Sequence, residues 1–205
     1  MKLLTYGFWI FTCWNISNQL SEASPSPEST PGQWPRLSPA NGSVDDYRLI
    51  EGLWLVTTHS HEIQSIIKLS LEKASDYRHA ILHGEIYRTF KLKGKPLPVI
   101  CEHGSKSYQG KPLRGLRIIK ELRPKSSDWD TLWEKGEIFN PENNLRIKAQ
   151  VRLIKQDTVE FSGIFRGIKR SARYQRIDEN SAQLKQLEQR AEQELQAHLM
   201  SDPKR

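Results

Sequence analysis

The sequence is poor in cysteine, with two cysteines in 205 residues. Cys13 lies in an apolar N-terminal stretch and Cys101 near the middle of the chain. If the N-terminal stretch is removed, a single thiol remains, so no intrachain disulfide is expected and a disulfide framework is excluded. The folded part must therefore be held together by packing of its side chains.

Long apolar runs are also lacking, and residues 3–14 form the main one. This run is shorter than the ~20 residues needed to cross a bilayer, and it stands between Lys2 and small polar residues. That order is typical of a secretory signal peptide over residues 1–23, with an uncleaved anchor as the alternative. Lipid attachment at Cys13 fits poorly, because Thr12 is a poor residue immediately before such a cysteine. The proline-rich residues 24–48 are expected to form an extended linker.

Catalytic motifs are missing as well: there is no Gly-rich phosphate loop, no nucleophile elbow and no paired carboxylate motif. We therefore expect no enzyme and no cofactor. His59, His61 and His103 are weak candidates for metal ligands, together with Cys101, if their loops meet. A metal-dependent enzyme is accordingly the third hypothesis, and scattered surface histidines are the simpler interpretation.

The charge is unbalanced, because 31 Lys and Arg exceed 24 Asp and Glu to give a net charge of +7. Such a balance favours an anionic partner, namely nucleic acid, lipid or a polyanionic glycan. Export argues against nucleic acid. A basic surface stripe is predicted at Arg146, Lys148 and Arg152, which suits a lipid or other anionic envelope component, although such stripes are usually only solvated outer faces.

Apolar residues alternate with cationic or amide residues over residues 145–153, which is the period of a strand with one buried face. The same alternation returns at 159–165, and the turn-forming residues 140–144 precede the first of these strands. Including these, strands are predicted at 49–57, 62–71, 80–90, 115–122, 133–139, 145–154, 158–165 and 171–177. Eight strands with short connections predict an all-β fold, a small antiparallel up-and-down barrel.

Two segments depart from the strand pattern. Residues 91–113 are rich in Gly and Pro and predict a long loop at one rim of the barrel. Leucines at a spacing of three or four residues predict an amphipathic helix over residues 182–200. Its apolar stripe either packs on the outside of the barrel or binds a partner, which is another protein or the same helix of a second copy.

Four short motifs lie along residues 49–177: Gly52-Leu53-Trp54, Pro112-Leu113-Arg114-Gly115-Leu116, Gly136-Glu137-Ile138-Phe139-Asn140-Pro141-Glu142 and Tyr174-Gln175-Arg176. Through them the segment resembles a bacterial envelope family known as domain of unknown function 2147. The resemblance implies a small lipocalin-like barrel exported to the periplasm or cell envelope of a Gram-negative bacterium. No function is established for that family.

The sequence departs from the family pattern at two positions. Tyr174 stands where tryptophan is common, and Gly104 stands where many relatives carry a second cysteine close to Cys101. A loop disulfide is therefore not implied for this chain.

The candidate ligand-binding or barrel-floor residues are Trp54, Phe161, Phe165, Tyr174 and Arg176. In lipocalin-type barrels an arginine of the last strand lies over a tryptophan of the first, so we expect Arg176 over Trp54 at a closed floor. The first hypothesis is a non-enzymatic envelope protein that binds a small apolar or amphipathic anionic molecule. The alternative is a structural or protein-interaction module whose barrel interior is filled by its own side chains.

Overall fold

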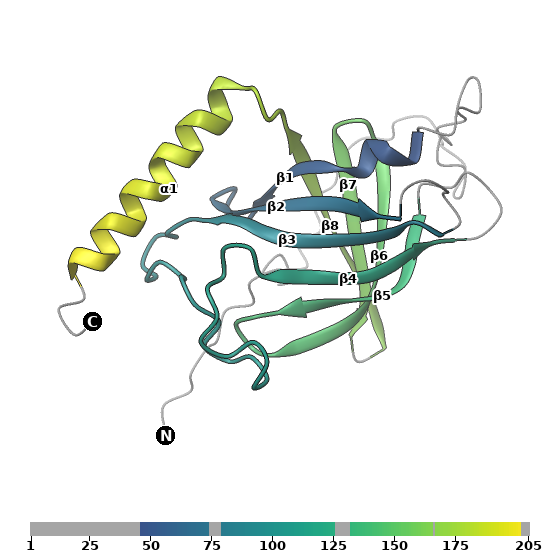
Figure 1. Ribbon diagram of the computed structural model, residues 1–205, viewed down its shortest axis with the longest axis horizontal. Coiled ribbons are helices and arrows are strands. Elements are labelled where there is room, and N and C mark those ends of the chain that lie inside the picture. Colours follow the sequence, from purple (N-terminus) through teal and green to yellow (C-terminus); the bar gives the residue numbers. More distant parts are fainter. Residues whose placement is uncertain (1–45, 74–78, 126–131, 166, 202–205) are drawn as a thin grey trace, which may run out of the picture.

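The computed structural model describes residues 46–73, 79–125, 132–165 and 167–201 (Figure 1). The predicted signal peptide and most of the predicted linker lie outside these residues. Within the described part, no helix is both long and apolar enough to cross a membrane.

Eight antiparallel strands form a closed barrel in which each strand pairs with its neighbour in sequence and β1 pairs with β8. The strands are β1 (Gly52–Thr57), β2 (Ile63–Glu72), β3 (Ile81–Thr89), β4 (Arg117–Pro124), β5 (Leu132–Asn140), β6 (Leu145–Lys155), β7 (Thr158–Phe165) and β8 (Ile168–Ile177). This confirms the predicted up-and-down barrel and its number of strands. The long loop between β3 and β4 is also as predicted.

The first strand begins later than predicted, because Asp46–Ile50 forms a 3-10 helix, η1, ahead of it. Tyr47 and Ile50 of this helix are buried in the barrel core. The backbone then turns at Gly52, whose φ of +123° is a conformation that side chains other than glycine rarely adopt. The folded domain therefore starts before residue 49, within the segment predicted to be linker.

The alternating pattern of β6 is reproduced in the structure. Ile147, Ala149, Val151 and Leu153 are buried, whereas Arg146 and Lys148 are exposed. Neighbouring strands contribute their own buried rows, so the inward side chains meet inside the barrel.

The backbones of β4 and β5 approach each other closely at Gly136. A Cβ at this residue would lie 2.2 Å from the carbonyl oxygen of Lys120. The two strands carry residues of positive φ beside this contact, Glu121 at 57° and Lys135 at 65°. The glycine that opens the Gly-Glu-Ile-Phe-Asn-Pro-Glu motif thus permits a backbone approach that no larger residue would allow.

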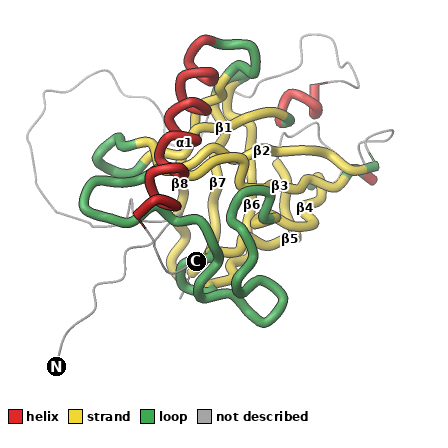
Figure 2. The backbone as a smooth tube through the Cα atoms, turned by 60° about the vertical axis from the view of Figure 1, so that its left-hand side comes forward, coloured by secondary structure: helices red, strands yellow, loops and turns green. Residues whose placement is uncertain are grey.

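Helix α1 (Ala182–Ser201) confirms the predicted C-terminal helix. Its residues Leu184, Leu187 and Ala191 are buried in a second apolar cluster outside the barrel, formed with β1, β2, β3 and β8. Ser181 caps the helix, since its hydroxyl accepts a hydrogen bond from the amide of Leu184 at 3.1 Å. Figure 2 shows α1 crossing the outside of the barrel beside β1, with the long β3–β4 loop near its C-terminal half.

Candidate functional site

One end of the barrel is closed by Trp54 and Arg176, which are paired residues of β1 and β8. The guanidinium carbon of Arg176 lies 4.4 Å from the centre of the Trp54 ring. Arg176 also donates hydrogen bonds to the carbonyl oxygens of Glu51 at 2.7 Å, Gln156 at 2.8 Å and Leu49. The Trp54 indole, which is fully buried, donates to the carbonyl of Ile50 at 3.0 Å.

This floor is built for closure. Burial lowers the pKa of Arg176, but a guanidinium remains charged throughout the physiological range, and its three carbonyl acceptors compensate for its lost water. The contact over Trp54 is the one expected from the sequence.

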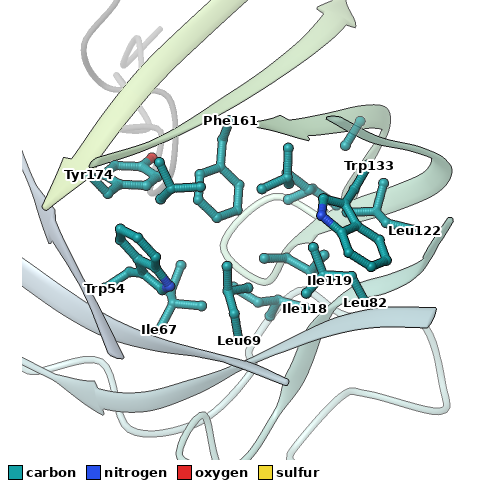
Figure 3. Close-up of a cluster of buried hydrophobic side chains, with 14 of the residues drawn as sticks. Trp54, Ile67, Leu69, Leu82, Ile118, Ile119, Leu122, Trp133, Phe161 and Tyr174 are labelled. Atoms are coloured by element: carbon teal, nitrogen blue, oxygen red, sulfur yellow. The ribbon is translucent and has the colours of Figure 1, made fainter. Parts of the chain in front are cut away.

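The barrel interior is filled by side chains (Figure 3). Trp54, Trp133, Phe161 and Tyr174 are 0%, 1%, 1% and 3% exposed, and the Phe161 and Tyr174 rings lie 5.0 Å apart. A water-sized cavity next to these rings would add accessible surface to them, and they have almost none. The side chain of Phe165 lies outside what the structure describes. Trp54, Phe161 and Tyr174 therefore serve as core residues, and they leave no room beside them for a ligand.

The opposite end is covered by the β3–β4 loop, residues 90–116, which docks on the β5–β6 turn. The buried thiol of Cys101 lies 3.6 Å from the carbonyl oxygen of Pro141, and the amide of Ser105 donates to Asn144 Oδ1 at 3.1 Å. Burial raises the pKa of the Cys101 thiol, so it is not an activated nucleophile. A Cβ at residue 104 would lie 2.7 Å from the Cys101 sulfur, so the loop is closely packed at Gly104.

Three buried polar atoms around this turn have no hydrogen-bond partner among the described residues: Asn140 Nδ2, Glu142 Oε2 and the Tyr108 hydroxyl. Asn140 is 1% exposed, and its Oδ1 accepts a hydrogen bond from the Glu142 amide at 2.9 Å. Burial raises the pKa of Glu142 to about 7, although Lys95 opposes the shift. The Asn-Pro-Glu motif thus forms a tight turn that carries a carboxyl group able to titrate near neutral pH.

A surface groove of about 1090 Å³ runs along the outer face of β4 to β8. Its basic lining residues are Lys120, Lys135, Lys148 and Lys169, and its acidic ones are Glu121, Glu134 and Glu137. Ile164, which is 63% exposed, lines the same groove. Gly136, where β4 and β5 approach closely, lines the groove as well.

Several of the charges in the groove are already engaged. Glu137 pairs with Arg146 at 2.8 Å, Glu134 accepts a hydrogen bond from Gln150 at 3.2 Å, and the Lys120 ammonium lies 4.5 Å from the centre of the Tyr108 ring. The ammonium groups of Lys135, Lys148 and Lys169 have no such contact with a described residue. The groove therefore offers three lysines that an anion could neutralise.

The three residues of the predicted basic stripe have different surroundings in the structure. Lys148 lies in the groove, whereas Arg146 is paired with Glu137 and covers the Phe139 ring at 5.6 Å. Arg152 is outside the groove lining and makes contacts of its own. The sequence pattern did not indicate Lys135, because Lys135 stands at an irregularity of β5. Ile164 is out of phase with the buried Val159 and Phe161, so the alternation directs it to the outer face, where an isoleucine is not a usual residue.

The candidate metal ligands do not assemble. His59 and His61 lie in the β1–β2 turn and His103 in the long loop, and no three His, Cys, Asp or Glu among the described residues come together as a metal site would require. The convergence considered from the sequence is therefore wrong for these residues. His83, which is buried, instead contacts Glu72 at 3.3 Å on the barrel wall.

Comparison with known proteins agrees with the fold. A family model described as "Uncharacterized protein conserved in bacteria (DUF2147)" matches residues 52–176, more than half of the chain. Protein HP1028 from the human pathogen Helicobacter pylori, described as belonging to the lipocalin family, is similar over 67% of this chain and 88% of its own, with a TM-score of 0.51 and 9% identity. That identity establishes a shared fold alone. No curated protein matches the chain.

Proposed function

We infer that this chain, which belongs to the uncharacterised bacterial family DUF2147, is a non-enzymatic protein of the cell envelope that binds an anionic, partly apolar small molecule. The binding site is the outer groove of β4 to β8. The observation that carries this proposal is the set of three lysines without acceptors, Lys135, Lys148 and Lys169, beside the exposed side chain of Ile164.

The groove suits such a molecule in size and chemistry. Its volume of about 1090 Å³ is slightly above the ~300 to 1,000 Å³ that is usual for ligand sites. A phosphate or carboxylate placed among the lysines would gain charge-assisted hydrogen bonds, while an acyl chain beside Ile164 would cover exposed apolar surface. The filled interior favours this outer site over binding inside the barrel.

The filled interior also supports a second candidate, a structural or protein-interaction module. Leu199 and Met200 at the end of α1 are 55% and 84% exposed, beyond the part of the helix that packs on the barrel. In this alternative a protein partner covers these residues, and the groove remains an ordinary solvated surface.

Binding of monomeric short-chain lipids tests the proposal. Dihexanoyl phosphatidylglycerol, which is anionic, is expected to bind about tenfold more tightly than the zwitterionic phosphatidylcholine analogue in calorimetric titrations. Lys148→Glu should weaken phosphatidylglycerol binding by about tenfold or more. Lys68→Glu is the matched control, because Lys68 is an exposed residue of β2 outside the groove.

Equal affinity for the two lipids would refute an anion site. If Lys148→Glu and Lys68→Glu weaken phosphatidylglycerol binding equally, then only the overall charge of the protein matters. If instead α1 residues are protected in hydrogen exchange by a co-purifying protein and lipid binding is absent, then the protein-interaction candidate is correct.

A further inference from the structure

The up-and-down order of the strands places four connections at one end of the barrel. Because successive strands alternate in direction, the connections after β1, β3, β5 and β7 share one end, opposite the floor closed by Trp54 and Arg176. We call this the mouth end. Its described parts are residues 58–62, residues 90–116, residues 141–144 and the outer residues of the β7–β8 hairpin, Ile164 and Ile168.

Two exposed isoleucines mark the tip of the β7–β8 hairpin. Ile164 is 63% exposed and Ile168 is 54% exposed, and both belong to the last two residue pairs of the hairpin. Side chains of this size are normally buried, and elsewhere in the described chain such exposure occurs only at Leu49, Leu199 and Met200. Lys169, which pairs with Ile164, is exposed as well.

The β3–β4 loop gives the mouth end a strong positive charge. Residues 90–116 contain six cations, Lys91, Lys93, Lys95, Lys106, Lys111 and Arg114, against one acid, Glu102. The five lysines are exposed, and their ammonium groups make no ion pair with a described residue. At the floor end the described connections and strand ends carry both signs, with Lys73, Lys125 and Lys155 against Asp157, Asp178 and Glu179.

The loop presents these lysines in an ordered arrangement. Its two stems are attached to α1, since the Lys91 amide donates to Glu194 at 2.6 Å and Arg114 pairs with Glu192 at 3.1 Å. Its middle is cross-linked by backbone hydrogen bonds between Cys101 and Lys111 at 2.8 Å and between Gly110 and Cys101 at 2.9 Å. Binding through this surface would therefore require little ordering of the loop.

We propose that the mouth end docks on an anionic lipid bilayer, with Ile164 and Ile168 entering the interface and the lysines of the β3–β4 loop lying at the level of the lipid phosphates. The lysines alone would suit any polyanion. The two isoleucines favour a lipid bilayer, because a polar glycan or a nucleic acid has no apolar surface that could bury their side chains. This docking goes beyond the proposed function, since it uses loop residues that lie outside the groove.

Partitioning into large unilamellar vesicles tests the docking, with the chain as purified from its own cells. Vesicles of phosphatidylcholine are compared with vesicles containing about one third phosphatidylglycerol. The protein should bind the anionic vesicles at least about tenfold better, and added salt should weaken that binding because exposed charges are screened.

Two matched triple variants locate the surface. Replacing Lys93, Lys95 and Lys111 by Glu is expected to reduce partitioning by about a hundredfold. Replacing Lys73, Lys125 and Lys155 by Glu changes the net charge equally at the floor end and should reduce it less than about fivefold. The double variant Ile164→Ser and Ile168→Ser keeps every charge and should reduce partitioning by about tenfold. Unchanged melting temperatures confirm that the variants are folded.

Three results would overturn the proposal. If the two triple variants lose vesicle binding equally, the effect is one of overall charge. If the wild type binds the soluble polyanion dextran sulfate as tightly as it binds the anionic vesicles, and the double isoleucine variant binds dextran sulfate equally well, then the surface recognises polyanions in general. Partitioning that no substitution changes would place the membrane contact outside the mouth end. Lys148→Glu with short-chain lipids tests the groove separately, so either idea can fail alone.

Discussion

Gly52 lies against the guanidinium of Arg176, and a Cβ at residue 52 would be 2.7 Å from Arg176 Nη1. Its φ of +123° independently requires glycine. The same guanidinium faces Trp54, and the three residues therefore form one unit that joins the first strand to the last. This unit explains why glycine and tryptophan occur two residues apart at the start of the barrel.

Trp54→Ala should destabilise the protein strongly, because the fully buried indole would leave a cavity at the floor. We expect a loss of about 3 to 5 kcal/mol in the free energy of unfolding, and a smaller loss of about 1 to 2 kcal/mol for Arg176→Ala. Urea denaturation measures both. If Trp54→Ala unfolds like the parent but loses lipid binding, then Trp54 belongs to a ligand site and the floor interpretation is wrong.

Gly136→Ala should also be destabilising, by about 3 kcal/mol, because the added methyl group would meet the backbone of β4. Gly94→Ala is the matched control, since nothing lies within 4 Å of its Cβ position and only its φ of +73° is strained. The control should cost about 1 kcal/mol. Similar losses in the two variants, measured by urea denaturation, would mean that the β4–β5 approach is less tight than the structure shows.

Glu142 should make stability depend on pH near neutrality. Its folded-state pKa is about 7, raised from 4.5 mainly by burial, so the folded protein binds this proton more tightly than the unfolded chain. The resulting stabilisation is complete below about pH 4.5 and is lost as the pH rises through about 7. Between about pH 5 and about pH 8 the wild type should lose about 1 to 2 kcal/mol relative to Glu142→Gln. Parallel stability curves for the two proteins in urea titrations would contradict this.

Leu187→Ala should cost about 2 to 3 kcal/mol, because Leu187 fills the apolar cluster between α1 and the barrel. Leu199→Ala, on the same helix but 55% exposed, should change stability by less than about 0.5 kcal/mol. Thermal unfolding followed by circular dichroism compares them. An equal effect of the two substitutions would show that the helix does not pack on the barrel through its N-terminal half.

The sequence by itself determined the barrel. The alternation in residues 145–153 decides which side chains face inward, because successive residues of a strand point to opposite sides. The leucine spacing of residues 182–200 likewise located the helix. Each of these signals is local, so it can be read from a few neighbouring residues.

Only the tertiary structure decided what the surfaces can do. Whether Phe161 and Tyr174 fill the interior depends on every strand at once, and whether Lys148 or Arg146 remains available depends on Glu137 of a neighbouring strand. Ile164 is out of phase with the buried Val159 and Phe161, so the alternation directs it outward, but only the structure shows that it remains 63% exposed there. Filling of the barrel interior, ion pairing of surface side chains and exposure to solvent all depend on residues that are distant in sequence. These residues come together only when the chain folds.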